Sequence, residues 1–279
     1  MKLNLNKMLL TSAEKQNKET VSQLISLWKT VFGDDEKYIR LFEPYLENFD
    51  VFVVKEDGKI VSAFYLLGAE IKKDCRVFKG KYLYAAATYE EYRSKGYMSS
   101  LINEAVSFYK NKVDFISLVP ADEGLYSYYG RFGFKALMYN YRTNLRCESK
   151  SRTDGIKTTN GSHINNKRRN SFDNLHLLTD ITMEYAVDCY GYFGSYFKHF
   201  DDAVILYVDD EKTLYEAIAE EKSQKNISEL IKKLFSGEVT VITQFPLNEN
   251  SEKIKCGMIC AFSDELKNTD EIYMNHTLM

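Results

Sequence analysis

The alternation of apolar and polar positions predicts helices at the start of the chain. From Val21 to Phe32 the apolar residues recur at helical spacing, and Gly33 ends that segment. Asp34 and Asp35 follow, and either carboxylate can cap a second helix from Glu36 to Leu46. The chain is therefore expected to begin with two amphipathic helices.

A hairpin and a strand–helix–strand unit are predicted next. Asp57-Gly58 lies between two runs rich in strand-forming residues, which is a strong signal for a hairpin turn. The segment from Tyr97 to Asn111 has a continuous apolar face and predicts a helix. The pattern also predicts strands over residues 82–88 and 115–119, a short helix that starts at Asp122 or Glu123, and a strand from Phe134 to Leu145.

Polar residues dominate the middle of the chain. Cys147 to Asn170 contains Ser, Thr, Asn, Lys and Arg with almost nothing apolar, which predicts a linker or a disordered loop. Lys167, Arg168 and Arg169 form a basic cluster within it. Such a cluster could touch phosphate, but in a polar loop it is expected to be solvated.

The second half starts near Ser171 and loosely repeats the element order of the first. Ile181 to Phe197 is predicted as a helix, and Leu214 to Glu221 as either a helix or the return arm of a hairpin. Strands are predicted over residues 204–208, 238–245, 254–262 and 272–278, and a helix over residues 227–235. No glycine loop occupies the place that Arg93–Tyr97 has in the first half.

Composition narrows the class of protein. The chain has 279 residues, a length typical of two domains, and its net charge of -3 gives no general attraction to nucleic acid or anionic membranes. No run is long enough to cross a bilayer, and residues 1–20 lack a signal-peptide apolar block, so we expect a cytoplasmic protein. The cysteines and histidines are scattered, which predicts neither disulfides nor a metal site.

The segment Arg93-Ser94-Lys95-Gly96-Tyr97 lies between a predicted strand and a predicted helix. Free N–H groups and the dipole at a helix start attract anions, and Gly96 lets the backbone approach a phosphate closely. The preceding Ala85-Ala86-Ala87 has little side-chain bulk, so an extended amide-bearing ligand could lie along it. A diphosphate joined to a pantetheine arm has both features. The predicted contacts to this cofactor are Ala86, Ala87, Thr88, Arg93, Ser94, Lys95, Gly96, Tyr97, Met98 and Ser99.

This segment resembles motif A of the GCN5-related N-acetyltransferases (GNAT), Arg/Gln-x-x-Gly-x-Gly/Ala. Met98 replaces the last small residue of the pattern, a departure from the family. Downstream, Tyr128-Tyr129-Gly130-Arg131-Phe132-Gly133-Phe134 is similar to the Phe-Tyr-x-x-x-Gly-Phe ending of the family's fourth helix. The motifs come in the family's order, and the resemblance covers about the first half of the chain.

The second half resembles the C-terminal part of two-domain bacterial members related to the enhanced-intracellular-survival acetyltransferases. The residues that carry this resemblance are Gly257-Met258-Ile259 and Tyr273-Met274-Asn275-His276. It implies an α/β protein with the GNAT fold, a mixed central sheet flanked by helices, followed by a second, degenerate GNAT-like domain. The expected boundaries are 1–146 for the catalytic domain, 147–170 for the polar linker and 171–279 for the second domain.

The resemblance implies acetyl transfer from acetyl-CoA to a primary amine by direct attack, without a metal. It also implies that Tyr129 acts as general acid and protonates the departing CoA thiolate. The general base stays open between Glu90, Glu91 and the terminal carboxylate of Met279. The acceptor is expected to be a small-molecule or peptide amine, and the sequence leaves its identity and the oligomeric state open.

Two other functions are compatible with such a fold. A non-catalytic CoA-binding or interaction module could keep the cofactor site without turnover. An aminoacyl transferase of the tandem-acetyltransferase kind would use charged tRNA in a basic groove and no CoA. The intact Arg93–Tyr97 loop and the acidic net charge argue against that second alternative.

Overall fold

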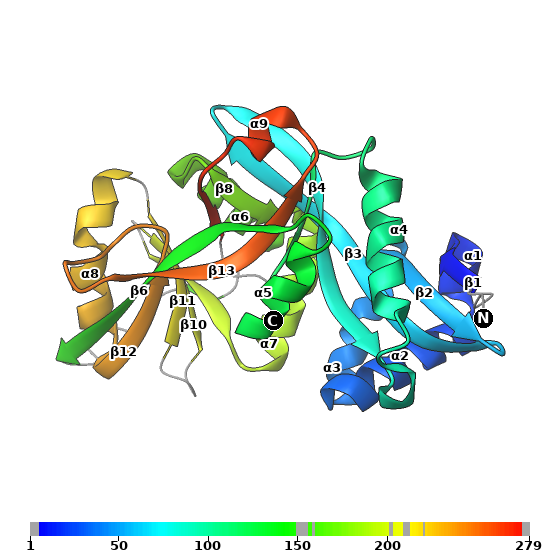
Figure 1. Cartoon of the computed structure of the whole chain (residues 1–279). Helices are drawn as coiled ribbons and strands as arrows, with labels where there is room; N and C mark the ends of the chain where they lie inside the picture. The colour runs from blue at the N-terminus through cyan, green and yellow to red at the C-terminus, as the bar shows by residue number, and fades with distance from the viewer. Residues whose placement is uncertain are drawn as a thin grey trace. The chain divides into compact units, whose positions relative to one another are not determined.

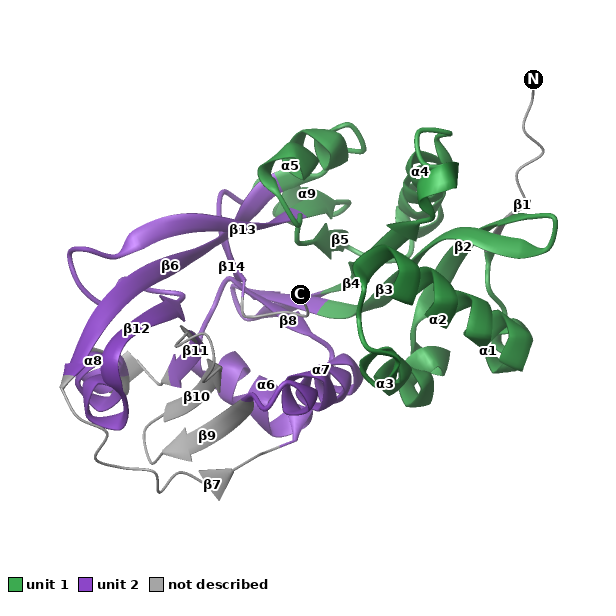
Figure 2. Ribbon diagram, turned by 90° about the horizontal axis from the view of Figure 1, so that it is seen from below, with its two compact units in different colours: residues 1–69, 79–135, 259–268 green, residues 70–78, 136–258, 269–279 purple. Residues whose placement is uncertain are grey.

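The chain folds into two compact units, which Figure 2 shows in different colours. The structure, a computed structural model, describes residues 6–148, 156–157, 160–200, 203–208, 213–219 and 221–274. Unit 1 contains residues 1–69, 79–135 and 259–268, and unit 2 contains residues 70–78, 136–258 and 269–279. Each unit therefore combines segments that are far apart in the sequence.

Unit 1 is a sheet with helices on both faces (Figure 1). Its strands pair in the order β1 (Asn6–Leu9), β2 (Asp50–Glu56), β3 (Lys59–Lys73), β4 (Arg76–Thr88) and β5 (Phe115–Leu118). Its helices are α1 (Ser12–Gln16), α2 (Lys18–Phe32), α3 (Glu36–Ile39), the 3-10 helices η1 (Arg40–Asn48) and η2 (Glu90–Tyr92), α4 (Tyr97–Tyr109), α5 (Glu123–Gly130) and α9 (Asp264–Lys267). β4 and β5 run parallel, joined through α4.

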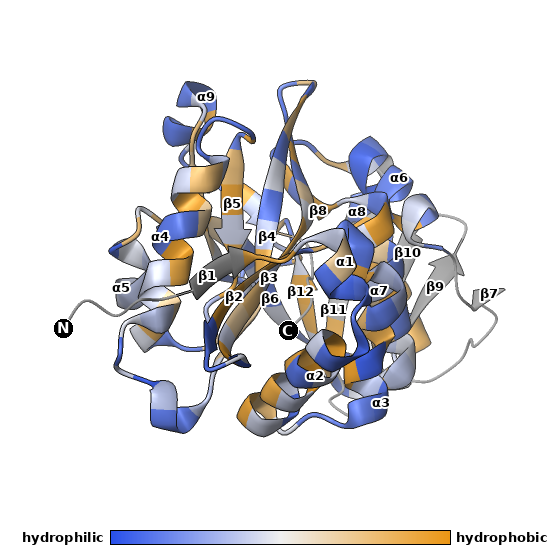
Figure 3. Ribbon diagram, turned by 90° about the vertical axis from the view of Figure 1, so that its right-hand side faces the viewer, coloured by the Kyte–Doolittle hydropathy of each residue, from blue (hydrophilic) through white to orange (hydrophobic). Residues whose placement is uncertain are grey.

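Both faces of this sheet are apolar because both are covered by helices. On the α4 side, the Phe52 ring stacks on the Phe64 ring with centroids 5.3 Å apart. It also packs edge-on against Phe108 of α4, with centroids 6.2 Å apart. On the other side, the ring centroid of Tyr65 lies 5.4 Å from that of Trp28 in α2. Successive residues of a strand point to opposite faces, so β3 reads as a continuous apolar run and not as an alternation. Figure 3 shows this hydrophobic character along β2 and β3.

The predicted turns and caps of unit 1 are confirmed. Asp57 and Gly58 both adopt positive φ, 47° and 81°, as a two-residue hairpin turn between β2 and β3 requires. Gly33 ends α2 in the left-handed conformation, and the Asp35 side chain caps α3. The predicted helix over 36–46 differs, because α3 tightens into η1 around Pro44, which lacks the N–H of a regular α-helix.

A strand from the far end of the chain also belongs to unit 1. The last residues of β13 (Glu252–Ala261) and all of α9 lie in this unit, and β13 follows β5 in the strand order. The backbone N–H of Phe262 donates to the carbonyl of Asp114 at 2.7 Å. The expected domain boundary at residue 146 differs from this division. Sequence pattern could not reveal it, because the pairing joins strands more than a hundred residues apart.

Unit 2 is also a sheet with helices. Its strands pair in the order β13, β6 (Lys135–Glu148), β12 (Ser236–Thr243), β11 (Thr213–Ala219), β10 (Ala203–Val208), β9 (Tyr196–Phe200) and β7 (Ile156–Lys157), and β14 (Ile272–Met274) pairs with β6 and β8 (Leu175–Leu178). Its helices are α6 (Gly161–Ser171), α7 (Asp180–Tyr192) and α8 (Glu221–Leu234). The open alternative for residues 214–221 is resolved as a hairpin arm, because β11 pairs antiparallel with β10.

The predicted polar linker is wrong over its second half, where residues 161–171 form α6. Arg168 is fully buried there and forms a bidentate ion pair with the buried Glu216. Arg169 bridges Glu70 and Asp180 at 3.1 and 3.0 Å. The expectation that these arginines are solvated was wrong. Their partners are up to 99 residues away in the sequence, and a local pattern cannot show such distant partners.

The predicted helix over 181–197 ends early. α7 stops at Tyr192, Gly194 takes a φ of 72°, and β9 begins at Tyr196. A glycine at positive φ breaks the helical geometry, so the aromatic run is split between two elements. Among the residues that the structure describes, no helix is long and apolar enough to cross a membrane.

Candidate functional site

The end of β4 has an irregular backbone at the three alanines. Ala85 has a φ of 50°, which is unusual for a residue with a Cβ, costs about 1–3 kcal/mol and persists only where the surroundings hold it. The next residues are tied to β3, because the Ser62 hydroxyl donates to the carbonyl of Ala87 at 3.2 Å and lies 2.8 Å from the Thr88 hydroxyl. Sequence reasoning missed Ser62, since its partners are more than twenty residues away.

The loop after β4 is exposed and carries two cations. Arg93, Ser94, Lys95 and Gly96 are all exposed. Ser94 and Gly96 adopt positive φ, 62° and 81°, which turns the chain sharply into α4. The Arg93 Nε donates to the carbonyl of Thr88 at 3.2 Å, and this bond holds the loop against the strand end.

The N-terminus of α4 lacks a side-chain cap. Gly96 is the N-cap residue and provides no side chain, and the first turn contains no acidic residue. The N–H groups of Tyr97, Met98 and Ser99 at this helix start therefore have no partner on the capping residue, and the dipole adds partial positive charge. Apart from Gly96 and its two chain neighbours, no described atom lies within 4 Å of the place that a Cβ would take at Gly96, so this position faces open space.

Helix α5 brings the second motif to this helix start. Asp122 caps α5 by accepting from the N–H of Leu125 at 3.0 Å. Near the other end, the Tyr128 hydroxyl lies 3.1 Å from the hydroxyl of Ser99 in the first turn of α4. The two motifs that the sequence singled out are therefore joined by one hydrogen bond. Tyr128 was not predicted as a site residue, although it stands beside one.

Tyr129 is buried next to Tyr128, with ring centroids 5.2 Å apart. Burial raises the pKa of the Tyr129 hydroxyl from 10.0 to about 12, and the nearby Tyr128 and Asp122 add to this. A raised pKa keeps the phenol protonated at neutral pH, so Tyr129 can donate a proton.

Two of the three predicted general bases lie in the described part of the chain. Glu90 and Glu91 lie on the exposed helix η2, and the Glu91 carboxylate is 3.8 Å from the Lys59 ammonium. Both carboxylates therefore contact solvent directly. Met279 lies outside the described residues.

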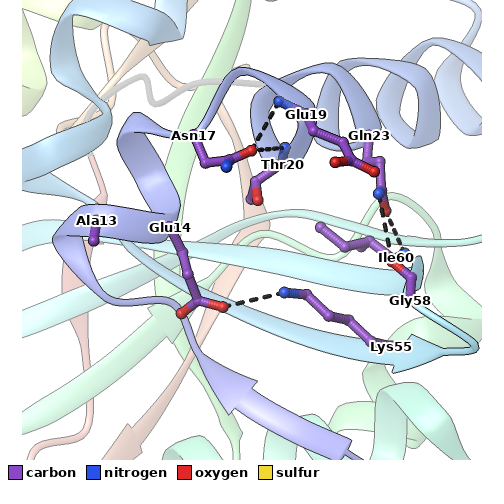
Figure 4. Close-up of a pocket in the computed structure, with 9 residues that line it drawn as sticks. All are labelled: Ala13, Glu14, Asn17, Glu19, Thr20, Gln23, Lys55, Gly58 and Ile60. Carbon is purple, nitrogen blue, oxygen red and sulfur yellow. Dashed lines mark hydrogen bonds and ion pairs between the residues drawn. The ribbon is translucent and has the colours of Figure 1, made fainter.

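A separate pocket of about 360 Å³ lies between α1, α2 and the β2–β3 hairpin (Figure 4). Four of its polar side chains are already engaged: Glu14 pairs with Lys55, Asn17 caps α2, and Gln23 contacts the hairpin backbone. None of the predicted site residues lines it. Within the described part of the chain, no group of three or more His, Cys, Asp or Glu side chains could hold a metal ion.

Comparison with protein families gives a match to the acetyltransferase (GNAT) domain over residues 12–137. This match contains the irregular strand β4, the loop and both motifs. No curated protein matches.

Solved structures are similar in fold. A GCN5-related N-acetyltransferase from Kribbella flavida is 12% identical with a TM-score of 0.65, covering 93% of this chain and 72% of that one. Eis1 from Mycobacterium abscessus is 9% identical with a TM-score of 0.67, covering 96% and 76%. At these identities the likeness concerns the fold alone. The family match over residues 12–137 agrees with the two sequence motifs, and this part of the chain is therefore a GNAT acetyltransferase domain.

Proposed function

We propose that this protein transfers an acetyl group from acetyl-CoA to the primary amine of a small molecule or peptide. The observation that carries the proposal is the uncapped, exposed start of α4 behind Gly96. Arg93 and Lys95 stand beside it, and the diphosphate of coenzyme A is an anion of the size and charge that a helix start binds. The GNAT domain at residues 12–137 supports acyl transfer in general.

The pantetheine arm would lie along the end of β4. Its amides can pair with strand backbone in the way that a peptide adds to a sheet edge. Ala86 is partly exposed there and has a small side chain, and the positive φ of Ala85 departs from regular strand geometry. Thr88 is fixed by Ser62, so the strand end is held before the cofactor arrives.

In the proposed reaction the neutral amine attacks the thioester carbon and a C–N bond forms. The C–S bond then breaks, and the thiolate leaves with the electron pair and takes the proton of Tyr129. The new amide nitrogen loses its extra proton, and this proton restores the Tyr129 hydroxyl. Before attack a base must remove a proton from the ammonium form of the acceptor. Glu90, Glu91 and the carboxylate of Met279 are the candidates for this base.

We also propose that the second half forms a degenerate GNAT-like domain. In unit 2, β11 and β12 pair in parallel and are connected through α8, as β4 and β5 are connected through α4 in unit 1.

The test is to incubate the full-length protein with acetyl-CoA and a panel of aminoglycosides, polyamines, peptides and lysine derivatives, and to measure thiol release. We expect release that depends on one class of amine, with mass spectrometry locating the acetyl group on its nitrogen. Tight binding of acetyl-CoA without release for any amine would favour the alternative, a non-catalytic CoA-binding module. No binding of acetyl-CoA would refute the proposal.

A further inference from the structure

The start of α4 is approached by a third cation, from a different element. Arg131 follows α5, and its guanidinium carbon lies 4.7 Å from the centroid of the Tyr128 ring. The hydroxyl of that same ring lies 3.1 Å from the Ser99 hydroxyl in the first turn of α4. Tyr128 therefore links Arg131 to the proposed phosphate site from the α5 side, whereas Arg93 and Lys95 come from the loop before α4.

The guanidinium of Arg131 is held in place and still available. Its Nε donates to the carbonyl of Tyr128 at 3.4 Å, and it also lies 6.0 Å from the Phe132 ring. Stacking on an aromatic ring fixes the plane of a guanidinium and leaves its terminal nitrogens free to donate. The side chain is exposed, and across the described residues no carboxylate forms an ion pair with it.

Other cations near the loop are used differently. Lys59 stacks on Tyr89 at 4.2 Å and pairs with Glu91 at 3.8 Å, so part of its charge is already balanced. Arg93 and Lys95 form no ion pair in the described parts of the chain, and together with the helix start they suffice for a diphosphate. Arg131 is thus an additional positive charge, which binding of the diphosphate does not require.

Coenzyme A carries one further anion, the 3′-phosphate monoester on its ribose. A monoester is close to doubly charged at neutral pH and accepts two parallel hydrogen bonds from a guanidinium. We propose that Arg131, positioned by Tyr128, binds this 3′-phosphate and makes the protein select coenzyme A over its 3′-dephospho form. This inference rests on the proposed function, because it concerns the same cofactor.

The test compares two ligands, acetyl-CoA and 3′-dephospho-acetyl-CoA, on the full-length protein and on Arg131→Gln by calorimetry. We expect wild type to bind the dephospho ligand about tenfold more weakly, as one charge-assisted contact at an exposed site predicts. Arg131→Gln should bind acetyl-CoA about tenfold more weakly, with less than about a twofold change for the dephospho ligand. Arg131→Lys, which keeps the charge and loses the planar stack, should fall between them.

Arg142→Gln is the matched control, because Arg142 is an exposed arginine on β6 outside the site, and it should change neither affinity. Equal weakening of both ligands by Arg131→Gln would overturn the proposal, since Arg131 would then act on the diphosphate or on the fold. Equal affinity of wild type for both ligands would overturn it while leaving the proposed function intact. If wild type binds neither ligand, the proposed function fails together with this inference.

Discussion

At the scale of single residues, burial decides what Tyr129 can do. The chain contains 21 tyrosines, and a phenol on the surface would titrate near pH 10. Tyr129 is 8% exposed, and removal from water disfavours its anion, which raises its pKa to about 12. The hydroxyl therefore stays protonated at neutral pH and well above it.

Tyr129→Phe tests this role because it keeps the ring and removes the proton. We expect turnover to fall roughly a hundredfold while acetyl-CoA affinity stays within about twofold of wild type. Since a group with a pKa of about 12 is still almost fully protonated about two pH units lower, Tyr129 should cause no decline in wild-type turnover between pH 8 and about pH 10. Steady-state kinetics across this range give both results. Equal turnover of the mutant and wild type would make Tyr129 a packing residue.

At the scale of elements, the start of α4 combines two requirements on Gly96. Its φ of 81° disfavours any residue with a Cβ, and the open space in front of it allows an anion to approach the helix. The first requirement concerns folding and the second concerns binding of the anion. A neutral and a charged substitution at Gly96 can distinguish the two effects.

Gly96→Ala and Gly96→Glu form a matched pair. Both should lower the free energy of unfolding by about 1 kcal/mol, because both place a Cβ at positive φ. Only Gly96→Glu adds a negative charge at the positive pole of the helix, so we expect its acetyl-CoA affinity to fall at least about tenfold below that of Gly96→Ala. Calorimetry on the folded variants measures this. If Gly96→Glu binds acetyl-CoA as tightly as Gly96→Ala does, the phosphate site is not at the start of α4.

At the scale of the whole molecule, unit 1 depends on residues 259–268. Ile259, Cys260 and Leu266 are buried, at 1%, 7% and 0% exposure, and the Cys260 thiol lies 3.8 Å from the carbonyl of Phe132. Burial of an isoleucine or leucine side chain contributes about 1.5–3 kcal/mol, against a total stability of about 5–15 kcal/mol for a domain. Loss of the segment would also expose the edge of β5.

We therefore expect a fragment of residues 1–170 to be unstable and to bind acetyl-CoA poorly, although it contains both cofactor motifs. Adding residues 252–268 through a flexible linker should restore much of the stability and the binding. Urea unfolding and calorimetry of the two fragments measure the difference. A fragment 1–170 as stable as the full chain, with full affinity for acetyl-CoA, would contradict this dependence on β13 and α9.

The sequence by itself determined the local structure of unit 1 and the candidate cofactor loop. Helical spacing, Asp-Gly at the hairpin, and caps at Asp35 and Asp122 act within a few residues, so a linear pattern contains them. The Arg93–Tyr97 loop was found for the same reason, since its glycine and its cations are consecutive. These signals also led to the GNAT domain, which the family match over residues 12–137 confirms.

Only the tertiary structure decided which segments share a core. Arg168 looks like a solvated residue in a polar stretch, but Glu216, 48 residues away, makes its burial possible by pairing with it. β13 completes unit 1 from the other end of the chain, and Tyr128 reaches Ser99 across 29 residues. Pairing and burial of this kind depend on distances in space, and no local periodicity records them.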